Sequence, residues 1–168
     1  MVTYGFEKKL EPSMNFRITG LSPAEFKHLF DLSESELAAM AIKRYVVDKK
    51  PGFPDRIALT DVEIGQTVLL LNHVSQPAVN PYRASHAIFV REGATHAYDA
   101  VNQIPDSLRI RFLSLRAYDS NDMMIDAEVV QGTSVEQVIV KLLANDDVRY
   151  IHVHNAKQGC YAARIDRA

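Results

Sequence analysis

The chain has 168 residues, of which 47% are apolar and 24% are charged, and its formal net charge is −2. This length is typical of one domain that can bury a core of its own, and the composition excludes an intrinsically disordered chain. Lys and Arg are scattered without a basic block, which excludes the usual electrostatic signature of a nucleic-acid-binding protein.

Two capping boxes near the N-terminus predict two short helices in tandem. Ser22 is followed by Glu25, and Ser33 is followed by Glu36, so each serine has a glutamate three residues later. In this arrangement the serine and glutamate side chains satisfy backbone N–H groups that a helix leaves unpaired at its start.

Most of the remaining chain is typical of β-strands bounded by turn residues. The runs that we expect to be strands are residues 41–47, 57–59, 67–73, 87–91, 95–98, 113–118 and 124–130. Pro105 favours a single helical turn, and Thr133 with Glu136 has the capping-box spacing of a longer helix. We therefore expect an α+β fold, with an extension at residues 1–13 and a single domain at residues 14–168. The domain has mainly antiparallel β-sheet, two N-terminal helices and one helix before a C-terminal β-hairpin.

The C-terminal hairpin, residues 149–166, holds the most chemically active side chains. A three-residue loop at 157–159 fits a type I turn followed by a left-handed glycine. This loop predicts one face with Tyr150, His152, His154, Cys160, Ala162 and Arg164, where His152 pairs with Arg164, His154 with Ala162, and Ala156 with Cys160. The opposite face is then mostly apolar, and a loop of two or four residues would move Cys160 to that apolar face.

Three side chains on this predicted face are candidate catalytic residues: His152, His154 and Cys160. Residues two apart on a strand lie ~7 Å apart on the same side, so the two imidazole rings could converge. Two imidazoles and a thiol can act as a base and a nucleophile, can bind a transition metal, or can belong to a solvated hairpin face. No carboxylate or further histidine follows at ligand spacing, so we assign no metal ligand.

The loop at residues 80–86 is the second candidate site, because it carries a guanidinium, a hydroxyl and an imidazole just before a predicted strand. Arg83 with Ser85 could hold a carboxylate or a phosphate, or Arg83 could make a structural salt bridge beside a proline turn. Asn155 and Arg164, on the hairpin, complete the candidate ligand-binding residues.

Several longer motifs resemble one known family, the bacterial proteins that contain domain of unknown function 1203. The motifs that carry the resemblance are Pro51-Gly52-Phe53-Pro54, Val68-Leu69-Leu70-Leu71-Asn72, Pro81-Tyr82-Arg83-Ala84-Ser85, Leu113-Ser114-Leu115-Arg116, Tyr150-Ile151-His152-Val153-His154 and Gly159-Cys160-Tyr161. The resemblance runs from about Met14 to the C-terminus. It implies a single domain and brings no established activity, substrate or catalytic residue.

Two features bear on where the protein works. The single cysteine cannot form a disulfide within the chain, which is typical of a reducing compartment. The first residues lack the apolar core of a signal peptide, and the longest apolar run, residues 37–42, is far shorter than the ~20 residues that cross a bilayer. We therefore expect a cytoplasmic protein without a membrane partner, and no cofactor-binding motif is visible.

Two hypotheses about function follow from these patterns. In the first, the protein is an enzyme or a small-ligand binder, with the hairpin face and the Arg83 loop surrounding an anion. In the second, it is a binding module without chemistry, such as a homodimer joined through a sheet edge. The sequence does not decide whether the protein is an enzyme.

Overall fold

The computed structural model describes residues 14–168, so the extension predicted for residues 1–13 lies outside the described residues. The strands are β1 (Phe16–Thr19), β2 (Lys43–Val46), β3 (Thr67–Gln76), β4 (Ala84–Arg91), β5 (Asp99–Val101), β6 (Phe112–Tyr118), β7 (Met124–Gln131), β8 (Tyr150–Asn155) and β9 (Tyr161–Arg167). The helices are α1 (Glu34–Ala39), α2 (Asp106–Arg109) and α3 (Val135–Leu143), with 3-10 turns η1 (Pro23–Glu25), η2 (Lys27–Leu29) and η3 (Gly132–Ser134).

The larger sheet has six strands in the order β5-β1-β9-β8-β6-β7, and every neighbouring pair is antiparallel. One face of this sheet packs on the apolar stripe of α3, where Ile139 and Leu142 meet Leu115 and Ile151 in the main core. Alternation along each strand places the polar residues of β8 on the other face. The prediction of a single α+β domain with mainly antiparallel sheet and a helix before the C-terminal strands is confirmed.

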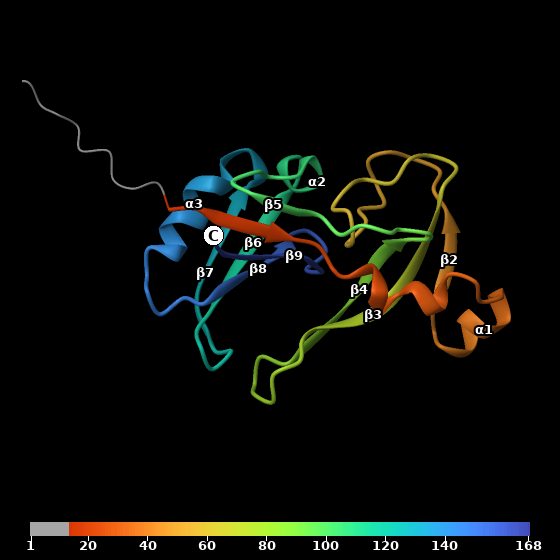
Figure 1. Ribbon diagram of the computed structural model, residues 1–168, viewed down its shortest axis with the longest axis horizontal. Coiled ribbons are helices and arrows are strands. Elements are labelled where there is room, and N and C mark those ends of the chain that lie inside the picture. The colour runs from red at the N-terminus through yellow and green to blue at the C-terminus, as the bar shows by residue number, and fades with distance from the viewer. Residues whose placement is uncertain (1–13) are drawn as a thin grey trace, which may run out of the picture.

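The smaller sheet has three antiparallel strands in the order β2-β3-β4. Its apolar face packs against the N-terminal turns, and Leu69 and Ile88 meet Phe26 and Leu37 in a second core. The second predicted helix is α1, with the capping box of Ser33 formed as expected. The first predicted helix consists of the two 3-10 turns η1 and η2. Figure 1 shows this sheet and α1 at one end of the molecule, and the six-stranded sheet with α3 at the other.

Aromatic and imidazole rings join the two sheets. His86 of β4 lies against His154 of β8, with ring centroids 4.9 Å apart. His73 of β3 lies 6.3 Å from the ring of Tyr161 on β9. The sheets therefore meet through polar rings, in contrast to the apolar cores behind each of them.

The prediction of a strand at residues 57–59 is wrong, because residues 56–58 form a turn. The buried carboxylate of Asp55 accepts hydrogen bonds from the backbone N–H groups of Ile57 and Ala58, at 3.2 and 2.8 Å. A side chain that satisfies its own local backbone in this way competes with strand pairing. The short strand predicted at residues 95–98 is also displaced, since β5 begins at Asp99.

The helix predicted after Thr133 is present as α3, but without the predicted capping box. Ser134 stands at its N-cap, and no side chain there accepts a capping hydrogen bond. Glu136 instead forms an ion pair with Arg109 of α2. None of the helices in the described part of the chain has the length and apolar content needed to span a bilayer.

The predicted register of the C-terminal hairpin is correct at His152, which pairs with Arg164, and wrong nearer the turn. His154 pairs with Tyr161 because a bulge at Ala162 inserts one extra residue into β9. The loop has four residues, 156–159, since the N–H of Asn155 donates to the carbonyl of Cys160 at 2.9 Å. Gly159 has the predicted left-handed backbone, with φ of 77°.

Candidate functional site

A cavity of about 560 Å³ lies beside the tip of the C-terminal hairpin, and we call it the hairpin-tip cavity. Its volume is within the range of small-ligand sites. Its lining consists of Pro51, Gly52, Pro54, Arg56, Leu70, Ser85, His86, Ala87, Phe89, Arg111, Asn155, Gln158 and Cys160.

Three segments that are distant in sequence converge on this cavity. The first is the turn at Arg56, which is tied to the sheet because Asp55 also accepts from the backbone N–H of Arg91 on β4 at 2.8 Å. The second is β4 itself, an edge strand of the smaller sheet. The third is the hairpin tip, where the four-residue loop and the bulge carry Asn155 and Cys160 to the cavity wall.

Arg56 is the central cation of the site, and its residue is only 2% exposed. Its Nε donates to the carbonyl of Tyr161 at 2.7 Å, its Nη1 to the carbonyl of Pro54, and its Nη2 to Sγ of Cys160 at 3.0 Å. Within residues 14–168, no carboxylate forms an ion pair with Arg56. Burial lowers the pKa of the Arg56 guanidinium, but such a group stays charged in proteins.

The other charged groups near the cavity have partners of their own. Arg111, which also lines it, forms a two-pronged ion pair with Asp61, with both N–O distances 2.6 Å. The carboxylate of Asp55 is occupied by backbone N–H groups. The lining itself contains no Asp or Glu. Arg56 is therefore the cation of the lining that has no ion-pair partner within residues 14–168, and the nearby charge of Asp55 acts on it without such a contact.

Cys160 receives hydrogen bonds from two side chains in the cavity wall. Besides Arg56, Nδ2 of Asn155 lies 3.6 Å from its Sγ. Asn155 is 4% exposed, and its Oδ1 is buried without a hydrogen-bond partner in the described residues. The cavity wall thus combines the sulfur of Cys160, which accepts from the cationic Arg56, with the unsatisfied Oδ1 of Asn155.

The two hairpin histidines do not contact Cys160 through any of the described hydrogen bonds. Nδ1 of His154 donates to the carbonyl of Gly159 at 3.0 Å, and its Nε2 is buried without a partner in the part of the chain described. Burial lowers the pKa of His154 to about 3 and, with the positive charges of Arg164 and Arg116, that of His152 to about 3. Such imidazoles are neutral near pH 7 and are weak general bases.

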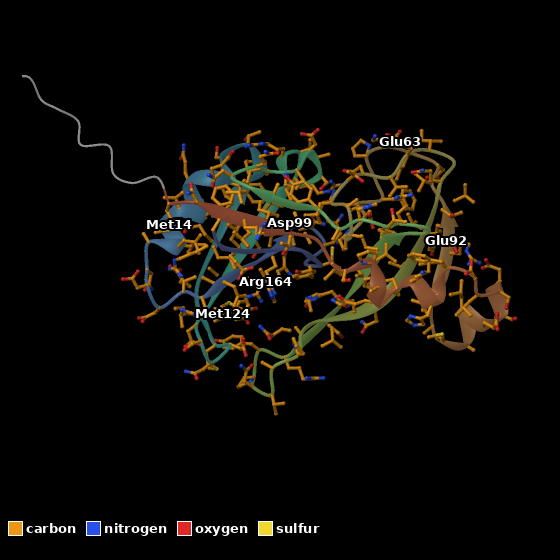
Figure 2. The ribbon with its side chains drawn as sticks, viewed as in Figure 1. Met14, Glu63, Glu92, Asp99, Met124 and Arg164 are labelled. Carbon is orange, nitrogen blue, oxygen red and sulfur yellow. The ribbon has the colours of Figure 1, made fainter. Side chains whose placement is uncertain are left out.

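His152 and Arg164 line a second, separate cavity of about 340 Å³, together with Gln76, Asp122 and Tyr150. The Tyr150 hydroxyl donates to Asp122 at 2.6 Å and accepts from Gln76 at 2.8 Å. The guanidinium of Arg164 lies 4.0 Å from the centre of the Tyr150 ring, and Asp166 neutralises it at 2.7 Å. In Figure 2, Arg164 lies near the middle of the molecule, away from Glu63 and Glu92.

The structure brings together some of the residues selected from the sequence and separates others. Ser85, Asn155 and Cys160 line the hairpin-tip cavity. Arg83 is exposed and donates to the carbonyl of Pro77, outside that lining. His152 and Arg164 belong to the second cavity. Within residues 14–168, no group of three or more His, Cys, Asp or Glu side chains is arranged to hold a metal ion.

Sequence reasoning missed Arg56, and no local signal could have found it. An arginine next to an aspartate has the ordinary look of an exposed charge pair, and its neighbour Ile57 was assigned to a strand. Only the contacts with Tyr161 and Cys160, 105 and 104 residues later in the chain, bury its guanidinium.

The fold and the site define an α+β protein with a cavity that lies between a sheet edge and a hairpin tip and is lined by a buried arginine. The chain belongs to the family described as protein of unknown function (DUF1203), whose model matches residues 52–167. This match includes Arg56, Ser85, Asn155 and Cys160 and begins after the N-terminal turns, so it is shorter than the resemblance seen from the motifs. No curated protein and no solved structure matches the chain.

Proposed function

We propose that this protein binds a small anionic ligand in the hairpin-tip cavity, with Arg56 as the group that holds the negative charge. The single observation that carries the proposal is the buried guanidinium of Arg56, which faces a cavity and lacks a carboxylate partner within residues 14–168. Removing a charge from water costs several kcal/mol unless a counter-charge compensates it. A bound anion supplies that counter-charge.

The hydrogen-bonding capacity of Arg56 supports the same proposal. A guanidinium has five N–H donors, and three of them are used by Tyr161, Pro54 and Cys160. The two that remain can bind a carboxylate or a phosphate. Ser85 and Asn155 add a hydroxyl and an amide to the same cavity. In this proposal Arg56 takes the role that the sequence suggested for Arg83.

Two variants with the same change of charge test the proposal. Arg56→Gln removes the buried cation, and Arg83→Gln removes an exposed one as the matched control. Calorimetric titration with inorganic phosphate, acetate and succinate measures binding to each. We expect Arg56→Gln to weaken binding by about tenfold or more and Arg83→Gln by less than about twofold.

The result is interpretable only for folded protein, so circular dichroism accompanies each titration. If Arg56→Gln does not fold, Arg56→Lys keeps the charge while removing the planar fork of donors, and we expect it to weaken binding of the two carboxylates. Equal losses in the Arg56 and Arg83 variants, or the failure of all three anions to bind the unmodified chain, would overturn the proposal.

A second candidate function is that of an interaction module in which another copy of the chain pairs with β7. This strand is the outer strand of the six-stranded sheet, and its side chains Ile125 and Val129 are 41% and 57% exposed. Free strand edges with apolar side chains favour pairing with a second chain. Light scattering of the unmodified chain and of the double variant Ile125→Lys, Val129→Lys tests this function. A dimer that the variant converts to a monomer supports it, and a monomer in both samples contradicts it.

A further inference from the structure

The sulfur of Cys160 accepts hydrogen bonds from a guanidinium and from an amide. Nη2 of Arg56 donates to Sγ at 3.0 Å, and Nδ2 of Asn155 lies 3.6 Å away. A neighbouring cation lowers the free energy of a thiolate relative to its thiol, and the thiolate is the nucleophilic form. Cys160 is not enclosed in the core, because it is only partly buried and lines the hairpin-tip cavity.

A second, independent feature of the same wall indicates that a ligand belongs there. Oδ1 of Asn155 is buried without a hydrogen-bond partner in the described residues, although the residue lines the cavity. Buried acceptors are rarely left unsatisfied in folded proteins, because losing the hydrogen bond to water is costly. A ligand that donates a hydrogen bond from the cavity would satisfy this oxygen.

The geometry also restricts the ligand. One Nη2 hydrogen of Arg56 is directed to Sγ and one Nη1 hydrogen to the carbonyl of Pro54, so each of these nitrogens keeps one hydrogen for an anion. An anion held by those hydrogens therefore lies close to Sγ of Cys160. If the anion is a carboxylate, the carbon that Sγ attacks must be bonded to that carboxylate or lie very near it.

We propose that Cys160 is a nucleophile that forms a covalent bond with a small electrophile whose reactive carbon carries a carboxylate. The thiolate electron pair forms the S–C bond, and the bond from that carbon to its leaving group breaks, so the leaving group departs with its electron pair. Arg56 holds the carboxylate, and the thiol proton passes to solvent water as the S–C bond forms. This activity rests on the anion-binding function proposed above.

Iodoacetate and iodoacetamide provide a matched pair of probes, since both place an electrophilic carbon next to a carbonyl and only iodoacetate is negatively charged. The chain contains one cysteine, so intact mass spectrometry reports the alkylation of Cys160 alone. The reference is the same chain unfolded in urea, in which the cysteine has no partner from the fold. The quantity of interest is the ratio of the iodoacetate rate to the iodoacetamide rate.

We expect this ratio to be about tenfold or more higher for the folded chain than for the unfolded chain. A folded ratio equal to or below the unfolded one would overturn the proposal.

The outcomes separate the nucleophile from the anion site. Binding of phosphate without enhanced alkylation refutes the nucleophile and leaves the anion-binding function standing. Fast alkylation by both probes with no preference for iodoacetate refutes the carboxylate-bearing substrate and the role of Arg56 as an anion holder. Arg83→Gln is the charge-matched control and should leave both rates within about twofold of the unmodified chain.

Discussion

At the scale of single residues, the molecule buries a guanidinium and two imidazole rings that lack some of their hydrogen-bond or ion-pair partners. Arg56 has carbonyl and sulfur acceptors but no carboxylate in the described chain, and His152 and His154 each leave a ring nitrogen unsatisfied. Buried polar groups of this kind reduce stability unless something else binds them. These groups cluster between the two sheets, where the proposed anion site lies.

The buried histidines predict a specific loss of stability in acid. Burial lowers the pKa of His152 to about 3, so the folded protein keeps this ring neutral while the unfolded chain protonates it near pH 6.5. The stabilising contribution is therefore complete above the unfolded pKa and is lost as the pH falls toward the folded pKa. By pH 5 the loss is on the order of 2 kcal/mol for each such histidine.

The variant His152→Phe tests this prediction, because phenylalanine fills a similar volume and cannot be protonated. Urea unfolding gives the free energy of unfolding at pH 7 and at pH 5 for each protein. The decrease from pH 7 to pH 5 should be about 2 kcal/mol smaller in the variant than in the unmodified chain. The control is His28→Gln, which removes an exposed histidine and should leave the pH dependence unchanged. An unchanged pH dependence in His152→Phe would show that His152 is protonated in the folded protein.

At the scale of elements, the position of Arg56 depends on how the end of β1 packs against the turn at residues 56–58. The N–H of Leu21 donates to the carbonyl of Arg56 at 2.8 Å. Gly20 lies so close to this turn that a Cβ atom there would be 2.0 Å from the carbonyl oxygen of Ile57. The absence of a side chain at Gly20 therefore allows the turn to approach the sheet.

Gly20→Ala should consequently destabilise the fold and displace Arg56. We expect a loss of roughly 2–4 kcal/mol in unfolding free energy, since the clash is with backbone and not with a flexible side chain. Gly52→Ala is the matched control, because the nearest atoms to its new methyl group belong to the movable side chain of Lys49. Equal stability of the two variants in denaturant unfolding would contradict this account of the β1 packing.

The hairpin illustrates what the sequence could and could not predict at this scale. Alternation and turn residues correctly predicted β8, β9 and the left-handed Gly159. The bulge at Ala162 has no local signal, because an alanine is equally compatible with a regular strand. It is favoured by tertiary packing, in which Tyr161 lies against His154 while Ala162 joins the core. The face assigned to Cys160 was wrong for this reason.

At the scale of the whole molecule, the cavity exists because two sheets with separate cores meet along polar surfaces. The α+β architecture could be predicted from the capping boxes and the strand-like runs, whereas the division into two cores appears only in the structure. The meeting of β4 with the hairpin tip was not visible, because no pattern within either segment specifies its distant partner. Ser85, Asn155 and Cys160 were therefore selected separately, and Arg56, which connects them, was found only in the folded chain.

The central claim is that an anion binds beside Arg56 in the hairpin-tip cavity, and protection of the single cysteine tests it most directly. The measurement is the rate of Cys160 alkylation by neutral iodoacetamide at increasing inorganic phosphate, with ionic strength held constant by sodium chloride. We predict a saturable decrease of about tenfold or more, which Arg56→Gln abolishes and Arg83→Gln retains. A rate independent of phosphate in the unmodified chain would contradict the claim.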